Sequence, residues 1–117
     1  MAWNYRRKGI PEVVTNRTAA AALERAATEL ASDLAGLLDE KAREGARSAE
    51  LEAAAVEAIR RGDDAEARAA LLERQNSVDR VKQLDADAAV VRAMLVECRE
   101  VLDQIAGSMP PQSSDEP

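Results

Sequence analysis

The sequence predicts an all-α protein built as a long antiparallel helical hairpin, in which two helices pack as a coiled coil. Three observations support this fold class. Long proline-free stretches flank one central glycine, apolar residues recur at heptad spacing on both sides of it, and the chain contains 46% hydrophobic residues but only 2% aromatic residues. A core made mostly of Ala, Leu and Val is thin for 117 residues. We therefore expect the hairpin to assemble into a four-helix bundle or a higher oligomer.

The chain divides into three predicted parts. Residues 1–10 form a flexible basic and aromatic tip, residues 11–107 form the helical hairpin, and residues 108–117 form a polar tail that we expect to be disordered. Within the hairpin we place the first helix at about 15–61, the turn at 62–63 and the second helix at about 64–106. Either Pro11 or the polar cluster Thr15–Thr18 begins the first helix, because proline suits the first helical position and Thr or Asn side chains cap helices.

The first helix carries one apolar series with an interruption. The series and the residues four positions after three of its members are Leu23, Ala27, Leu30, Leu34, Leu37, Leu51, Ala55 and Ala58. Glu44 stands where the heptad calls for an apolar residue. Gly45 beside it and Gly36 before it are weak helix formers, so we expect a bend or a loosely packed stretch there.

A short turn separates the helices. Arg60 and Arg61 place positive charge at a helix C-terminus, and Gly62 supplies a left-handed stop. Asp63 and Glu66 have the spacing of a capping box for the second helix. So short a connection predicts that the second helix folds back antiparallel to the first.

The second helix contains the most regular pattern in the chain. Its predicted helix-packing seam alternates four and three residues through Leu84, Ala88, Val91, Leu95, Cys98, Leu102 and Ile105. Upstream, Leu71, Val78 and Val81 precede Leu84 at spacings that resemble a stammer. A second apolar row consists of Val90, Met94 and Val101. The two rows together span roughly 160° of the helix, more than one partner helix covers, so the second row is the predicted oligomer or partner face.

The sequence lacks the residue patterns that common catalytic and metal sites use. It has no histidine, one cysteine and no Gly-rich phosphate loop, so we expect neither catalysis nor a metal or other cofactor. Its many carboxylates alternate with Arg and Lys, which is typical of a solvated helix face. Cys98 lies on the apolar seam, where packing is a better explanation than reactivity.

Charge is distributed unevenly. The net charge is −6, and because Arg6, Arg7 and Lys8 contribute +3, the rest of the chain carries −9. An acidic body argues against nucleic acid as a partner. Trp3 and Tyr5 beside those cations predict a tip that binds anionic lipid or a partner protein, and the alternative is a disordered terminus without a role. One cysteine and no secretion or membrane-spanning segment predict a soluble cytoplasmic protein, with attachment to the inner face of the membrane as a further hypothesis.

The central segment resembles a known hairpin. Residues 58–91, AIRRGDDAEARAALLERQNSVDRVKQLDADAAVV, resemble the hairpin of the ESCRT-III and phage-shock protein A superfamily. The likeness rests on the small and basic end Ala58–Arg61, the Gly62-Asp63 turn, the stretch Ala67–Arg74 and the QLDA segment Gln83–Ala86. The quoted segment is 34 of the 117 residues, and the resemblance implies a non-enzymatic protein whose long hairpins assemble on membranes.

Two functions follow as hypotheses. The first is a self-assembling coiled-coil hairpin whose partner is itself, with a possible role at membranes. The alternative is an acidic helical adaptor, chaperone or inhibitor that binds a larger protein. A secreted hairpin of the Trp-x-Gly kind fits less well, because the turn has Gly62 but no tryptophan.

Overall fold

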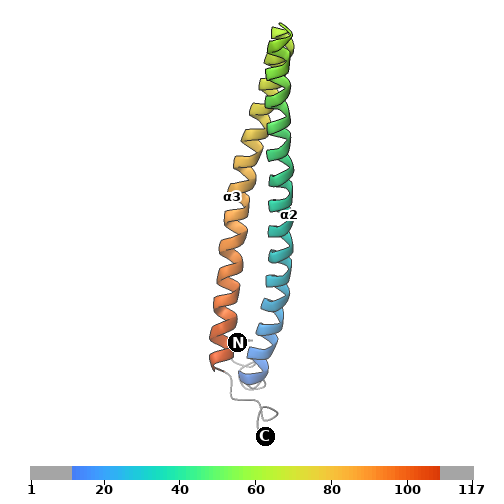
Figure 1. Cartoon of the computed structure of the whole chain (residues 1–117). Coiled ribbons are helices and arrows are strands. Elements are labelled where there is room, and N and C mark those ends of the chain that lie inside the picture. Colours follow the sequence, from blue (N-terminus) through green and yellow to red (C-terminus); the bar gives the residue numbers. More distant parts are fainter. Residues whose placement is uncertain (1–11, 109–117) are drawn as a thin grey trace, which may run out of the picture. The chain divides into compact units, whose positions relative to one another are not determined.

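The computed structural model describes residues 12–108, with side chains described from Asn16 onward. The described chain consists of helix α2 (Glu12–Arg60) and helix α3 (Asp64–Ser108), which residues 61–63 connect (Figure 1). The predicted all-α antiparallel hairpin of two long helices packed against each other is therefore confirmed.

The helix ends differ slightly from those that the sequence suggested. Helix α2 begins at Glu12, directly after Pro11 in the sequence and ahead of the Thr15–Thr18 cluster. Helix α3 continues through Gly107 to Ser108. Helix α2 also runs without a break through Gly36 and Gly45, where a Cβ atom added to either glycine would meet nothing within 4 Å. Neither glycine is therefore needed for close contact with a neighbouring segment.

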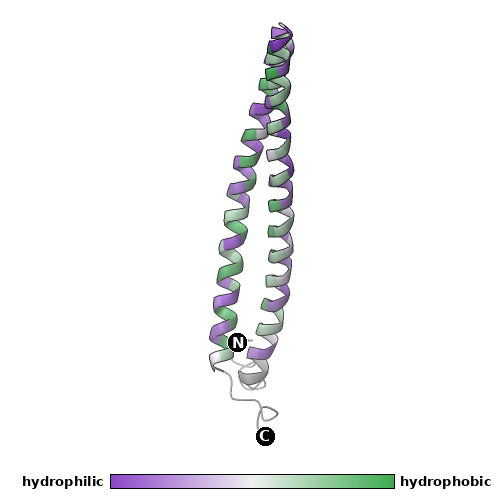
Figure 2. Cartoon of the chain, in the orientation of Figure 1, coloured by the Kyte–Doolittle hydropathy of each residue, from purple (hydrophilic) through white to green (hydrophobic). Residues whose placement is uncertain are grey.

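The described residues belong to two compact units, which are taken separately below. The turn unit comprises residues 32–92, and the terminal unit comprises the described residues 12–31 and 93–108. Hydrophobic and hydrophilic positions alternate along both ribbons (Figure 2). This alternation is the pattern of helices that bury one face only.

The core of the turn unit is made mainly of small side chains. Next to the turn, Ala55 and Ala58 of α2 and Ala67 and Ala70 of α3 are all buried. Further along α3, Leu84 is fully buried and is the largest side chain in the described chain to be so. An interior of this kind contributes little apolar area per ordered residue, so its stabilisation is modest.

The terminal unit has a still smaller core. Leu95 is its one buried apolar residue among those described, with 5% of its surface exposed. The remaining apolar positions that face inward are only partly buried, and they include Leu23, Leu30, Leu102 and Ile105. The unit thus holds its helices with side chains that stay in contact with water.

Leu71 does not occupy the inward position that the apolar spacing suggested. It is 45% exposed, and its neighbour Leu72 is 72% exposed, whereas Ala67 and Ala70 are buried. We attribute this to the short turn, which holds the two helix ends close together, so that alanine fits between them and leucine does not.

Candidate interaction surface

The turn ends α2 with a Schellman motif centred on Gly62. Gly62 has a positive φ of 76°, its N–H donates to the carbonyl of Ile59 at 3.0 Å, and the N–H of Asp63 donates to the carbonyl of Ala58 at 2.8 Å. These two bonds satisfy carbonyls that the end of α2 would otherwise leave unpaired. The turn is therefore specified by local hydrogen bonds as well as by packing.

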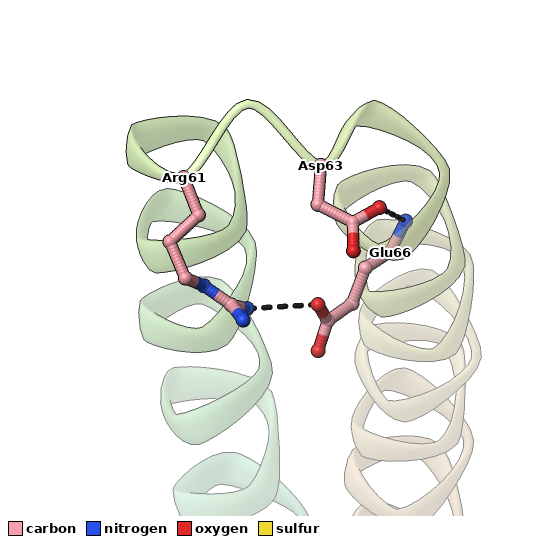
Figure 3. Close-up of polar contacts among 3 residues, drawn as sticks. All are labelled: Arg61, Asp63 and Glu66. Carbon is pink, nitrogen blue, oxygen red and sulfur yellow. Dashed lines mark hydrogen bonds and ion pairs between the residues drawn. The ribbon is translucent and has the colours of Figure 1, made fainter.

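The predicted capping box is only half formed (Figure 3). The Oδ1 atom of Asp63 accepts a hydrogen bond from the backbone N–H of Glu66 at 3.1 Å, as a helix cap should. The Glu66 carboxylate does not return to the N–H of Asp63. It accepts a hydrogen bond from Nη2 of Arg61 at 2.8 Å. The reason is that the Schellman bond to Ala58 already uses the N–H of Asp63.

Ion pairs connect α2 to α3 along the turn unit. The nitrogen–oxygen distances are 2.6 Å for Lys41–Asp85, 2.6 Å for Arg80–Glu40, 2.9 Å for Arg47–Glu73 and 3.7 Å for Arg74–Glu52. All four pairs are at least partly exposed to solvent, so each adds little stability. Their value lies in specifying the antiparallel register, since a shifted α3 would separate these partners. The hydrogen bond and the charge of Glu40 raise the pKa of Arg80 above its ordinary value.

Two polar side chains of α3, Arg74 and Ser77, interrupt the apolar interior of the turn unit, and we call them the polar belt. Ser77 is buried with 3% of its surface exposed, and the Nε atom of Arg74 is buried without a hydrogen-bond partner. An open hollow beside the belt is lined by Glu44, Arg47, Glu73, Asn76, Ser77 and Arg80. Both arginines of the hollow are already paired with carboxylates. Its charges therefore serve the contact between helices and do not form an evident site for a charged ligand.

Chemistry-bearing clusters are not found elsewhere in residues 12–108. No group of three or more His, Cys, Asp or Glu side chains there is arranged to hold a metal ion. Neither described helix contains a stretch long and apolar enough to cross a bilayer. The single cysteine, Cys98, is free and partly buried in the terminal unit.

Exposed aliphatic side chains are the most distinctive feature of the surface. Nine large hydrophobic residues are exposed among those described: Leu38, Val56, Ile59, Leu71, Leu72, Val90, Met94, Val96 and Val101. Only two large hydrophobic residues, Leu84 and Leu95, are buried. Single exposed aliphatic residues are common, but here the exposed set is more than four times as large as the buried set among the described residues.

The structure places the residues of the predicted seam as follows. In the turn unit, Leu84 and Ala88 are buried and Val91 is partly buried; in the terminal unit, Leu95 is buried, and the later members Cys98, Leu102 and Ile105 are partly buried.

The predicted oligomer or partner face lies on the surface. Val90 is exposed in the turn unit, while Met94 and Val101 are exposed in the terminal unit. The predicted lipid or partner tip, comprising Trp3, Tyr5, Arg6, Arg7 and Lys8, lies outside the described residues.

The periodicity of the sequence did not identify the exposed aliphatic residues near the turn. Val56 and Ile59 stand beside the buried Ala55 and Ala58, and Leu72 stands near the buried Ala70. A signal was present, because alanines at heptad spacing beside larger aliphatic residues allow a close helix contact that directs the larger residues outward.

Comparison with known proteins adds no assignment: no protein-family model, curated protein or solved structure matches this chain.

Proposed function

We propose that this protein is a non-enzymatic helical hairpin that functions by self-assembly. The observation that supports the proposal is the contrast between nine exposed and two buried large hydrophobic residues in the described chain. Burying one such side chain contributes roughly 1.5–3 kcal/mol. Covering several of them would contribute an amount comparable to the whole stability of a small domain.

The candidate assembly face in the terminal unit consists of Met94 and Val101, which are 47% and 40% exposed. Val90, which is 60% exposed in the turn unit, precedes them at helical spacing on α3. A second copy of the hairpin would cover such residues with its own aliphatic side chains. A four-helix bundle of two hairpins is the simplest assembly of this kind.

Light scattering on the purified protein at micromolar concentration tests the proposal, and we expect a mass of at least twice that of one chain. Replacing Met94 and Val101 together with Asp should lower the mass, and if this face is the only contact between copies the product should be a weakened or unfolded monomer. Ala93→Asp is the control, because Ala93 is an exposed small residue of the same unit. A stable monomer for the unmodified protein would contradict the proposal and favour the alternative, an acidic adaptor that binds a different protein.

A further inference from the structure

Helix α3 carries a second heptad series on its solvent side, within the turn unit. We call it the outer stripe; its members alternate four and three residues apart and are Ala65, Ala69, Leu72, Asn76, Asp79, Gln83, Ala86 and Val90. Every one of these residues is exposed, with Leu72 at 72% and Val90 at 60%. Only Asp79 among them is charged, in a chain with 32% charged residues. A regular and nearly uncharged series on an exposed helix face is typical of a coiled-coil contact.

The outer stripe faces away from the contact with α2 along most of its length, and Asn76 also borders the hollow that Glu44 and Arg47 of α2 line. At about 100° per residue, the mean direction of the stripe is roughly 150° from that of the buried α3 residues near the turn, such as Ala70, Ser77 and Leu84. Helix α3 therefore has two separate seams. The inner seam packs on α2, and no segment of the described chain covers the outer stripe.

We infer that the outer stripe binds the same stripe of a second copy in antiparallel orientation. This inference rests on the proposed self-assembly and adds a contact in the turn unit, because a pairing that ends at Val90 does not extend to Met94 and Val101. A series that alternates four and three residues keeps its spacing when reversed, and the antiparallel register that pairs all eight members of the stripe is centred between Asn76 and Asp79. Antiparallel pairing then places Asn76 opposite Asp79, Leu72 opposite Gln83, Ala69 opposite Ala86 and Ala65 opposite Val90.

Hydrogen-bond complementarity between Asn76 and Asp79 favours a second copy of the chain in antiparallel orientation. The amide of Asn76 donates hydrogen bonds, and the carboxylate of Asp79 accepts them, so the two antiparallel partners are complementary. Asp79 already accepts a bond at 3.0 Å from Gln75 of its own helix, and a carboxylate has further acceptor positions. Parallel pairing would instead place Asp79 against Asp79 in a partly dry contact, which like-charge repulsion disfavours.

The composition of the stripe also disfavours a lipid surface as its occupant. Asn76, Asp79 and Gln83 at its centre would lose their hydration in a bilayer without gaining hydrogen-bond partners. Ala69 and Ala86, by contrast, leave little side chain between the paired helices. They permit the close approach that would bring the central polar groups within hydrogen-bond distance.

Cysteine cross-linking tests the orientation. In the full chain carrying Cys98→Ala, the double variant A69C/A86C should form covalent dimers on mild oxidation, because antiparallel pairing brings residue 69 of one copy beside residue 86 of the other. A disulfide needs Cα atoms about 4.4–6.8 Å apart. Roughly 25 Å of helix separates residues 69 and 86 within one chain, so a bond inside one chain is impossible.

The single variants A69C and A86C are the controls, and both should stay monomeric on a non-reducing gel. Cross-linking of A69C alone would show parallel pairing and overturn the inference. An oligomer by light scattering whose double variant does not cross-link would also overturn it, while leaving self-assembly intact. A monomer by light scattering would overturn both.

A polar exchange tests the central pair. N76D places two carboxylates opposite each other, and we expect it to raise the dimer dissociation constant by about tenfold or more. The double variant N76D/D79N restores one amide opposite one carboxylate and should recover most of the lost affinity. An N76D variant with unchanged affinity, or a double variant without recovery, would contradict the pairing.

Leucine variants test the face. L72E introduces a charge at the most exposed aliphatic position of the stripe and should weaken self-association by about tenfold or more. Leu71, 45% exposed, is adjacent in the sequence but points off the stripe, so L71E is the matched control and should weaken self-association far less. Equal effects of the two variants would count against the outer stripe as the contact.

Discussion

Replacing Gly62 with alanine should destabilise the hairpin, while the same replacement at Gly45 should stabilise it. Both positions are exposed, and at both an added Cβ atom would meet nothing within 4 Å. The two variants therefore add the same atoms to equally open space. They differ in backbone conformation, because Gly62 has a φ of +76° and Gly45 lies inside α2.

The magnitudes follow from that difference. A left-handed conformation costs a residue with a Cβ atom about 1–2 kcal/mol, and the smaller entropy of the unfolded alanine chain offsets about 0.4–1 kcal/mol of it. We expect Gly62→Ala to lower the free energy of unfolding by about 1 kcal/mol. In a helix interior alanine is better than glycine by about 0.5–1 kcal/mol, so Gly45→Ala should raise the free energy of unfolding by that amount.

Urea unfolding followed by circular dichroism at 222 nm measures both effects. All variants should be compared at one protein concentration, because assembly makes apparent stability depend on concentration. Gly36→Ala serves as a second helical control and should behave as Gly45→Ala does. A Gly62→Ala variant as stable as the parent would refute the assigned role of the left-handed turn. Destabilisation by Gly45→Ala would mean that this glycine has a contact or a bend to preserve.

Three further perturbations have expected outcomes. Leu84→Ala, at the fully buried position, should lower the free energy of unfolding by about 2–5 kcal/mol in the same urea assay; a loss below about 1 kcal/mol would show that this leucine is not central to the core. Asp63→Ala should cost about 1 kcal/mol by removing the cap on Glu66, and Asp63→Asn should retain most of the stability, so equal losses would argue against a capping role. Deleting residues 1–9 should abolish co-sedimentation with anionic vesicles at low salt without altering the helical circular dichroism signal; an intact protein that ignores such vesicles would end the membrane hypothesis.

The hairpin was predictable because its signals are local. Gly62 and Asp63 specify a stop and a cap through backbone geometry and one side-chain bond, and both act within a few residues. The hydrogen-bond partner of the Glu66 carboxylate was not predictable in the same way. It depends on which backbone N–H the turn leaves free, and that choice is made by the Schellman bond to Ala58.

The candidate surface was only partly predictable. Val90, Met94 and Val101 stand out as a second apolar row and are exposed in the structure. The outward direction of Leu71 and Leu72 could not be read from periodicity, since either the leucines or the neighbouring alanines can fill an inner heptad position. The distance between the helices near the turn decides between these sets, and that distance is a property of the folded hairpin.

The ion pairs of the turn unit mark contacts of increasing sequence separation, from which an order of folding can be predicted. The partners Arg61 and Glu66 are 5 positions apart in sequence, Arg47 and Glu73 are 26 apart, and Glu40 and Arg80 are 40 apart. Each later contact closes a longer loop if formed alone, and a shorter one when the previous contact exists: Glu40 and Arg80 lie only 7 positions beyond Arg47 and Glu73 on each helix. The helices should therefore zip together from the turn outward. On unfolding, the same contacts would break in the reverse order, and the Arg61–Glu66 pair beside Gly62 would break last.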